Sequence, residues 1–215
     1  MNWEMILYID DDVRAKRPLR YWKELLYEWV LMVHRVYRVS NKKASVYAEK
    51  ERANTGLLAA AAIKNGWVAL EECRTEKSHK QFKRSTYSGR CDLMLWRDIR
   101  YHEIEAKFSR ISIVARSNVR VDKAYAKAVA DSKRSTSAGY RSEKKIAITY
   151  IVPVVRPKLI KKLTDDQIAV RLKELIQAIE NEKKPTLIAY AFPGPVQLVG
   201  SKNIGLGVIL IGVIT

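Results

Sequence analysis

Two short segments with strand-like alternation, residues 89–96 and 101–108, follow each other with only four residues between them. Side chains alternate between the two faces of a strand, so Leu93 and Leu95 share one face of the first segment, and Ile104 lies on the apolar face of the second. Two such segments joined by a short connection are typical of a β-hairpin. This hairpin constrains the fold most, because it commits the middle of the chain to a sheet.

The polar faces of this predicted hairpin carry acids and a lysine. Asp92 precedes Glu105 by thirteen residues, and Lys107 follows Glu105 by two. Alternation places Glu103, Glu105 and Lys107 on one face of the second segment. If that face lies beside Asp92, two carboxylates and one ammonium converge at one end of the hairpin. Mg²⁺ binds through oxygen ligands, so we expect a metal site there, with Lys107 positioning or polarising a water. The alternative is a solvated face of alternating acids.

The composition indicates a folded chain with a polyanionic partner. The 215 residues suit one domain spanning 1–215, and 47% of them are hydrophobic, which is enough for a core. Forty Lys and Arg against 23 Asp and Glu give a formal net charge of +17. This charge favours nucleic acid as the partner, with an anionic membrane surface as the alternative.

The cysteines and the apolar segments indicate the cellular compartment in which the protein is expected. Cys73 and Cys91 form no C-x-x-C motif and no Cys/His cluster, so we expect no structural zinc and two reduced thiols. Asp10, Asp11 and Asp12 interrupt the N-terminal apolar run, which argues against a signal peptide. No stretch reaches the roughly 18–20 apolar residues of a membrane span. We therefore expect a cytoplasmic protein with no membrane partner.

The hydrophobic periodicity and the turn signals predict an α/β protein. Helix and strand signals alternate, with a basic loop predicted over residues 74–90. The predicted order is helix, strand, strand, strand, helix, strand, followed by another helix and strands. The helices are expected near residues 18–38, 44–65, 118–133 and from 164, and the strands at 67–73, 89–96, 101–108, 146–155, 187–192 and 208–213.

The spacing Asp92…Glu105-Ala106-Lys107 resembles the core motif of the PD-(D/E)XK nuclease superfamily. The predicted element order is also that of this superfamily's restriction-endonuclease-like αβββαβ core. The resemblance implies a central mixed sheet flanked by helices, with a catalytic core at residues 44–155. An N-terminal helical extension (1–43) and a C-terminal helix with strands (156–215) fall outside it. Cys91 stands where the family name has proline, a loosely kept position.

The resemblance implies roles for individual residues. Asp92 and Glu105 would bind one or two Mg²⁺ ions, with Mn²⁺ as a substitute, and Lys107 would assist the attacking water. Many members add a glutamate from the first core helix, and here Glu49 and Glu51 compete for that role. They lie about 160° apart on a helix, so only one can face the sheet. The helix pattern aligns Glu49 with apolar positions and gives it a weak preference, as a further catalytic residue and metal ligand.

The implied function is that of a magnesium-dependent endonuclease that hydrolyses DNA phosphodiester bonds. Residues 107–145 hold eleven basic and three acidic side chains, which makes this segment a candidate for contacts with the DNA backbone. Two alternatives stay open. One is a nucleic-acid-binding module that keeps the fold without the chemistry. The other is a basic interaction protein that meets an acidic protein or a membrane. The sequence also leaves open a homo-oligomer or an unknown protein partner.

Overall fold

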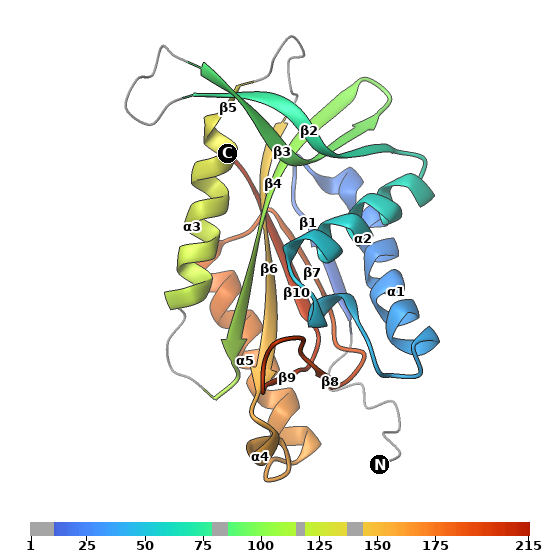
Figure 1. Ribbon diagram of the computed structural model, residues 1–215, viewed down its shortest axis with the longest axis vertical. Coiled ribbons are helices and arrows are strands. Elements are labelled where there is room, and N and C mark those ends of the chain that lie inside the picture. Colours follow the sequence, from blue (N-terminus) through green and yellow to red (C-terminus); the bar gives the residue numbers. More distant parts are fainter. Residues whose placement is uncertain (1–10, 79–85, 115–118, 137–143) are drawn as a thin grey trace.

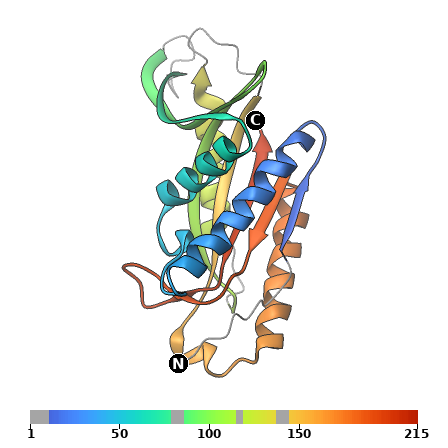
Figure 2. The ribbon, with the colours of Figure 1, turned by 90° about the vertical axis from the view of Figure 1, so that its right-hand side faces the viewer.

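The computed structural model describes residues 11–78, 86–114, 119–136 and 144–215. They form an α/β protein in which one mixed sheet runs through the molecule, with helices on both of its faces (Figures 1 and 2). The strand order is β1-β7-β10-β6-β4-β3-β2-β5, and β9 pairs with β6 and β8. The strands are β1 (Asp12–Ala15), β2 (Val68–Ser78), β3 (Thr86–Arg97), β4 (Arg100–Ser112), β5 (Ser135–Thr136), β6 (Lys144–Val155), β7 (Leu187–Ala191), β8 (Val196–Gln197), β9 (Ile204–Gly205) and β10 (Val208–Ile214).

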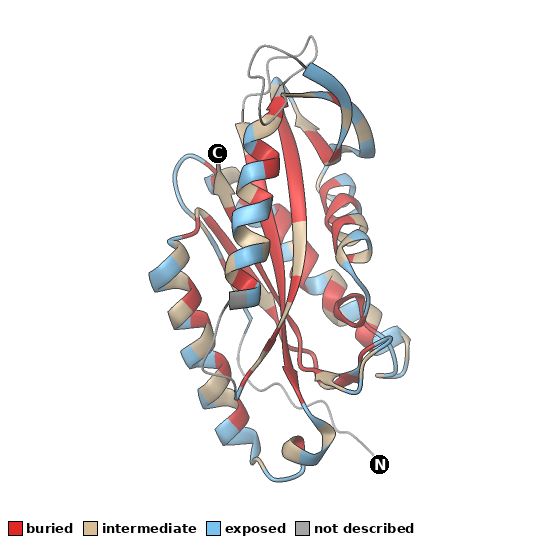
Figure 3. Ribbon diagram, turned by 60° about the vertical axis from the view of Figure 1, so that its left-hand side comes forward, coloured by how far each residue is buried: buried red, intermediate tan, exposed pale blue. Residues whose placement is uncertain are grey.

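Two layers of helices cover the sheet. On one face lie α1 and α2, and on the other lie α3 and α5 (Figure 1). The central strands between them are largely buried, whereas β2, the start of β3 and the outer helix surfaces are largely exposed (Figure 3). The helices are α1 (Lys23–Val39), α2 (Glu51–Lys64), α3 (Val119–Arg134), α4 (Pro157–Ile160) and α5 (Asp165–Lys183), with short 3-10 helices η1 (Arg20–Trp22) and η2 (Val46–Ala48).

The central elements follow along the chain in the order α2, β2, β3, β4, α3, β5 and β6. The strands β4 and β6 are parallel, and α3 lies between them in sequence, as a parallel pair requires a long connection. The segment before α2 and the segment after β6 add strands to the same sheet, because β1 pairs with β7 and β10 pairs with β6. The α/β prediction is therefore confirmed, and the terminal segments share the sheet of the central part.

The second helix begins later than predicted. Residues 44–65 were expected to be helical throughout, but α2 starts at Glu51 after extended backbone at Glu49 and Lys50. The buried Tyr47 hydroxyl donates to the carbonyl of Gly194 at 2.6 Å, and this contact holds the preceding segment in η2. Tertiary packing has overridden local helix propensity here.

The basic loop predicted over residues 74–90 is largely a strand pair. β2 continues to Ser78 and β3 begins at Thr86, with Lys77 opposite Tyr87 in register. Alternating polar and basic residues can occupy a strand whose faces are partly solvated, which a charge-based loop prediction misses.

None of the helices in the described ranges is long and apolar enough to cross a membrane.

Candidate active site where β3 and β4 diverge

Asp92 lies at the point where two neighbouring strands separate. The antiparallel ladder of β3 and β4 runs from Arg97 opposite Arg100 to Leu93 opposite Ile104. Immediately beyond it, the Oδ2 atom of Asp92 accepts the backbone N–H of Ala106 at 2.7 Å. A backbone N–H that leaves a ladder needs another acceptor, and this carboxylate provides it.

Lys107 lies at the centre of three carboxylates. Its Nζ atom is 3.6 Å from Asp92 Oδ2, 3.7 Å from Glu51 Oε1 and 3.8 Å from Asp131 Oδ2. The same ammonium donates to the carbonyl of Ala106. Burial lowers the pKa of Lys107, but the surrounding carboxylates outweigh burial and raise it overall. The structure thus holds a charged ammonium between strand β4 and helices α2 and α3.

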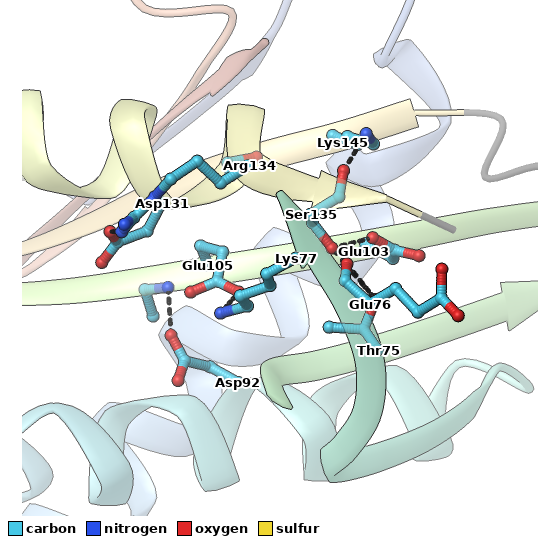
Figure 4. A network of polar contacts seen from close by, with 12 residues as sticks. Thr75, Glu76, Lys77, Asp92, Glu103, Glu105, Asp131, Arg134, Ser135 and Lys145 are labelled. Carbon is cyan, nitrogen blue, oxygen red and sulfur yellow. Dashed lines mark hydrogen bonds and ion pairs between the residues drawn. The ribbon is translucent and has the colours of Figure 1, made fainter. Parts of the chain in front are cut away.

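Glu105 is a buried carboxylate with its own cation. The Nζ atom of Lys77 on β2 donates to Glu105 Oε1 at 2.7 Å, and both side chains are largely shielded from solvent. Figure 4 shows Lys77 directed at Glu105, with Asp92 and Asp131 to one side. Burial raises the pKa of Glu105 to about 7, although Lys77 acts in the opposite direction. The effect of burial on the pKa of Glu105 is therefore larger than the opposing effect of its ion pair with Lys77.

The glutamate that reaches this group is Glu51. It lies in the first turn of α2, where its carboxylate meets Lys107, and burial raises its pKa. Glu49 lies outside the helix and is exposed beside Arg110 at the surface. The weak preference for Glu49 assumed a helix that already runs through residue 49. Because α2 begins at Glu51, the structure brings Asp92, Glu105, Lys107 and Glu51 together and leaves Glu49 out.

The sequence pattern did not identify two residues that lie in this group of charged side chains, Lys77 and Asp131. Lys77 belongs to the stretch that was interpreted as a basic loop, so no face could be assigned to it. Asp131 lies near the end of α3, where Arg134 also pairs with it. Nothing in the spacing of Asp131 points to β4, since only the packing of α3 on the sheet brings it close to Lys107.

Glu103 takes part in a separate network. Its carboxylate accepts hydrogen bonds from the Tyr101 hydroxyl at 3.1 Å and from the Ser135 hydroxyl. The Ser135 hydroxyl also lies 3.2 Å from Thr75 Oγ1, so the network ties β5 to β2 and β4 (Figure 4). The sequence pattern placed Glu103 on the same strand face as Glu105 and Lys107. In the structure its contacts are with hydroxyl groups.

The arrangement is a compensated charge cluster. Four carboxylates, those of Glu51, Asp92, Glu105 and Asp131, face the ammonium groups of Lys77 and Lys107 and the guanidinium of Arg134. Over the part of the chain that the structure describes, no three Asp, Glu, His or Cys side chains are grouped so as to hold a metal ion. In this arrangement the lysines occupy the space among the acids.

Comparisons of this chain with protein-family models, with curated proteins and with solved structures found no match.

Proposed function

We propose that this protein is a metal-dependent endonuclease that hydrolyses DNA phosphodiester bonds. The observation that carries the proposal is the position of Lys107, whose ammonium lies 3.6 Å from Asp92 and 3.7 Å from Glu51 next to the buried Glu105. These residues lie on elements that follow in the order α2, β2, β3, β4, α3, β5 and β6, and apart from the two-residue strand β5 this is the order that the resemblance to the restriction-endonuclease-like core implies.

The carboxylates suit a divalent cation of the magnesium class. Asp92, Glu105 and Glu51 offer oxygen ligands, which Mg²⁺ and Mn²⁺ prefer. The raised pKa of Glu105 marks a buried acid that a cation would stabilise in its charged form. Lysine stems are flexible, so Lys77 can release Glu105 Oε1 without movement of the backbone. Lys107 contacts one oxygen of Asp92 and one of Glu51, which leaves the other oxygen of each carboxylate to the cation. When bound, the cation would polarise the phosphate and activate a water.

The protein's own groups complete the proposed chemistry. Asp92 and Glu51 hold the Lys107 ammonium in place, where it orients the attacking water and offsets negative charge that develops on the phosphate. Asp131 adds a further contact to the same ammonium from α3. Lys107 is therefore positioned from both faces of the sheet.

Basic residues of α3 extend the site toward a polyanion. Arg120, Lys123 and Lys127 recur at helical spacing and are exposed. Lys127 is close enough to Glu51 to lower the pKa of that carboxylate, which places its charge beside the proposed site. Together with the net charge of +17, this face supplies sequence-independent contacts to phosphates.

A second candidate is a DNA-binding module without catalysis. It is favoured by the ion pair of Lys77 and Glu105 at 2.7 Å and by the lack, among the described residues, of a ready-made group of metal ligands. In that case the carboxylates would serve to hold the lysines in place, and metal would have no effect on the DNA.

The deciding experiment incubates the protein with plasmid, linear and single-stranded DNA in Mg²⁺, Mn²⁺ or EDTA. We expect cleavage only with metal, and a loss of about 100-fold or more for Asp92→Asn and Lys107→Ala. Asp92→Asn keeps an oxygen acceptor for the Ala106 N–H and removes only the charge. If the wild-type protein binds every DNA form yet cleaves none with either metal, the binding module becomes the better description.

A matched pair of variants tests the assignment of the helix glutamate. Glu51→Gln should lose most of the metal-dependent activity, because it removes a carboxylate that contacts Lys107. Glu49→Gln removes the same charge two residues earlier at an exposed position, and it should cleave like the wild type. Equal activities of the two variants would contradict the role of Glu51.

A further inference from the structure

A cavity of about 530 Å³ lies on the sheet beyond the charge cluster, between β2, β3 and β4. Its apolar lining includes Leu70, Met94, Trp96 and Tyr101. This volume falls within the usual range for small-molecule sites, which are mostly apolar with a few polar groups. The cavity is thus large enough for a nucleobase-sized ligand.

An aromatic pair lines this cavity, in which Trp96 is half-buried and Tyr101 is buried. The rings of Trp96 and Tyr101, opposite each other on β3 and β4, lie 5.1 Å apart at an angle of 35°. Across from them on β2, Leu70 is 50% exposed and Val68 is 57% exposed. Val68 is the partner of Trp96 in register, and Leu70 is the partner of Met94. These side chains form a continuous apolar strip that helices α3 and α5 do not bury.

Polar groups border the apolar strip. Glu103 lines the cavity, and its carboxylate is fixed by hydrogen bonds from the hydroxyl groups of Tyr101 and Ser135. Arg74 also lines the cavity and lies directly opposite Arg90 on the neighbouring strand. A buried carboxylate can accept a hydrogen bond from the amino or imino group of a base, and arginines suit a phosphate.

The cavity adjoins the proposed active site. Glu103 and Glu105 are two residues apart on β4 and point to the same face, which separates their Cα atoms by about 7 Å. Trp96 pairs with Tyr101, which lies six residues or about 20 Å along β4 from Lys107, so a single strand with a phosphate at Lys107 could place a base a few nucleotides further along against Trp96. Bases of a regular duplex are stacked inside the helix, whereas bases of a single strand are free to stack on an aromatic side chain.

We propose that this cavity binds an unstacked base of single-stranded nucleic acid. The inference rests on the proposed function for the identity of the polymer, and it adds the form of the substrate. Charge complementarity favours this occupant over a protein segment, because Arg74 lines the cavity and the chain carries a net charge of +17.

The test measures binding in EDTA, so that it does not depend on cleavage. An oligothymidylate of about 15 nucleotides, the size of a typical single-strand site, is compared with a duplex of equal length. The single strand should quench tryptophan fluorescence through Trp96, because Trp22, Trp29 and Trp67 are buried, and the Trp96→Leu variant separates this signal from that of Trp3, which lies outside the described residues. Trp96→Leu should remove this quenching and weaken single-strand binding by about tenfold, while duplex binding stays unchanged.

The matched control is Tyr27→Leu, which removes an exposed aromatic ring from α1 on the other face of the sheet. It should bind both forms like the wild type. Leu70→Asp provides a second variant at a half-exposed position, and it should also weaken single-strand binding, by adding a negative charge to the strip. Unchanged binding by Trp96→Leu, or an equal loss for single strand and duplex, would overturn the inference. Trp96-dependent binding without cleavage would instead count against the nuclease proposal alone.

Discussion

His102 should make the stability of this protein depend on pH in a defined way. The imidazole is fully buried at the start of β4, between Trp22 and Trp67, and its Nε2 atom lies 2.9 Å from the Tyr21 hydroxyl. Burial, together with the nearby positive charge of Lys144 and Arg100, lowers the pKa of His102 from 6.5 to about 4. The imidazole of His102 therefore binds a proton less tightly in the folded protein than in the unfolded chain.

The sign and the magnitude follow from linkage. Between pH 6.5 and pH 4 the unfolded state binds a proton at this position and the folded state does not, so acid favours unfolding. The free energy of unfolding should fall, relative to neutral pH, by about 2 kcal/mol near pH 5 and by about 3 kcal/mol near pH 4. Above pH 6.5 the imidazole is neutral in both states and contributes no pH dependence.

The pH dependence of the unfolding free energy of the wild type alone will not isolate the contribution of His102. Glu105 acts with the opposite sign, because its pKa is raised in the folded state from 4.5 to about 7. The folded protein therefore binds this proton more tightly than the unfolded chain, and stability rises as the pH falls through this range. A comparison of two proteins that share Glu105 and differ at His102 cancels this contribution.

The assay is urea unfolding of the wild type and of His102→Gln in EDTA, from about pH 8 to about pH 4. Glutamine keeps a polar group near Tyr21 and cannot titrate. As the pH falls across this range, the unfolding free energy of the wild type should decrease by about 3 kcal/mol more than that of His102→Gln. If the two curves run parallel, the imidazole is not the buried neutral group that the aromatic cluster implies.

Three further outcomes are expected. Lys77→Met should lower the free energy of unfolding by about 3 kcal/mol above neutral pH, because it removes the cation that stabilises the buried Glu105 carboxylate, whereas adding Glu105→Gln should recover most of the loss in urea unfolding. Alkylation followed by mass spectrometry should modify the half-buried Cys73 before the fully buried Cys91, and single-stranded DNA should slow the reaction because Cys73 lines the cavity with Trp96. DNA binding measured by filter retention should weaken by about 10³-fold between about 50 and about 200 mM salt, and indifference to salt would contradict binding through phosphates.

The central hairpin was predictable because its signal is local. Strand alternation separates Leu93 and Leu95 from the acids, and in the structure both leucines are buried in the core that α1 and α2 cover. The same alternation, with a period of two, places Glu105 and Lys107 on one strand face. The order of elements followed from periodicity and turn residues, which depend on neighbours within a few positions.

The residues that were missed depend on contacts between distant segments. Lys77 meets Glu105 because β2 continues as a long strand, and the basic composition of that stretch concealed its pairing. Asp131 meets Lys107 because α3 packs on β4, which no spacing rule along one helix reveals. The choice between Glu49 and Glu51 depended on the first residue of a helix, and that helix begins at Glu51 and not at Ala44 as predicted.

The divergence of β3 and β4 explains why these distant residues meet at one place. Where the ladder ends, a backbone N–H needs an acceptor, and Asp92 supplies it through Oδ2. That contact places a carboxylate in the gap between two strands, within reach of Lys107 on one of them. The helix α2 then contributes Glu51 from one face of the sheet, and α3 contributes Asp131 from the other. A regular ladder would have closed this gap, so the same local irregularity that interrupts the sheet also creates the charge cluster.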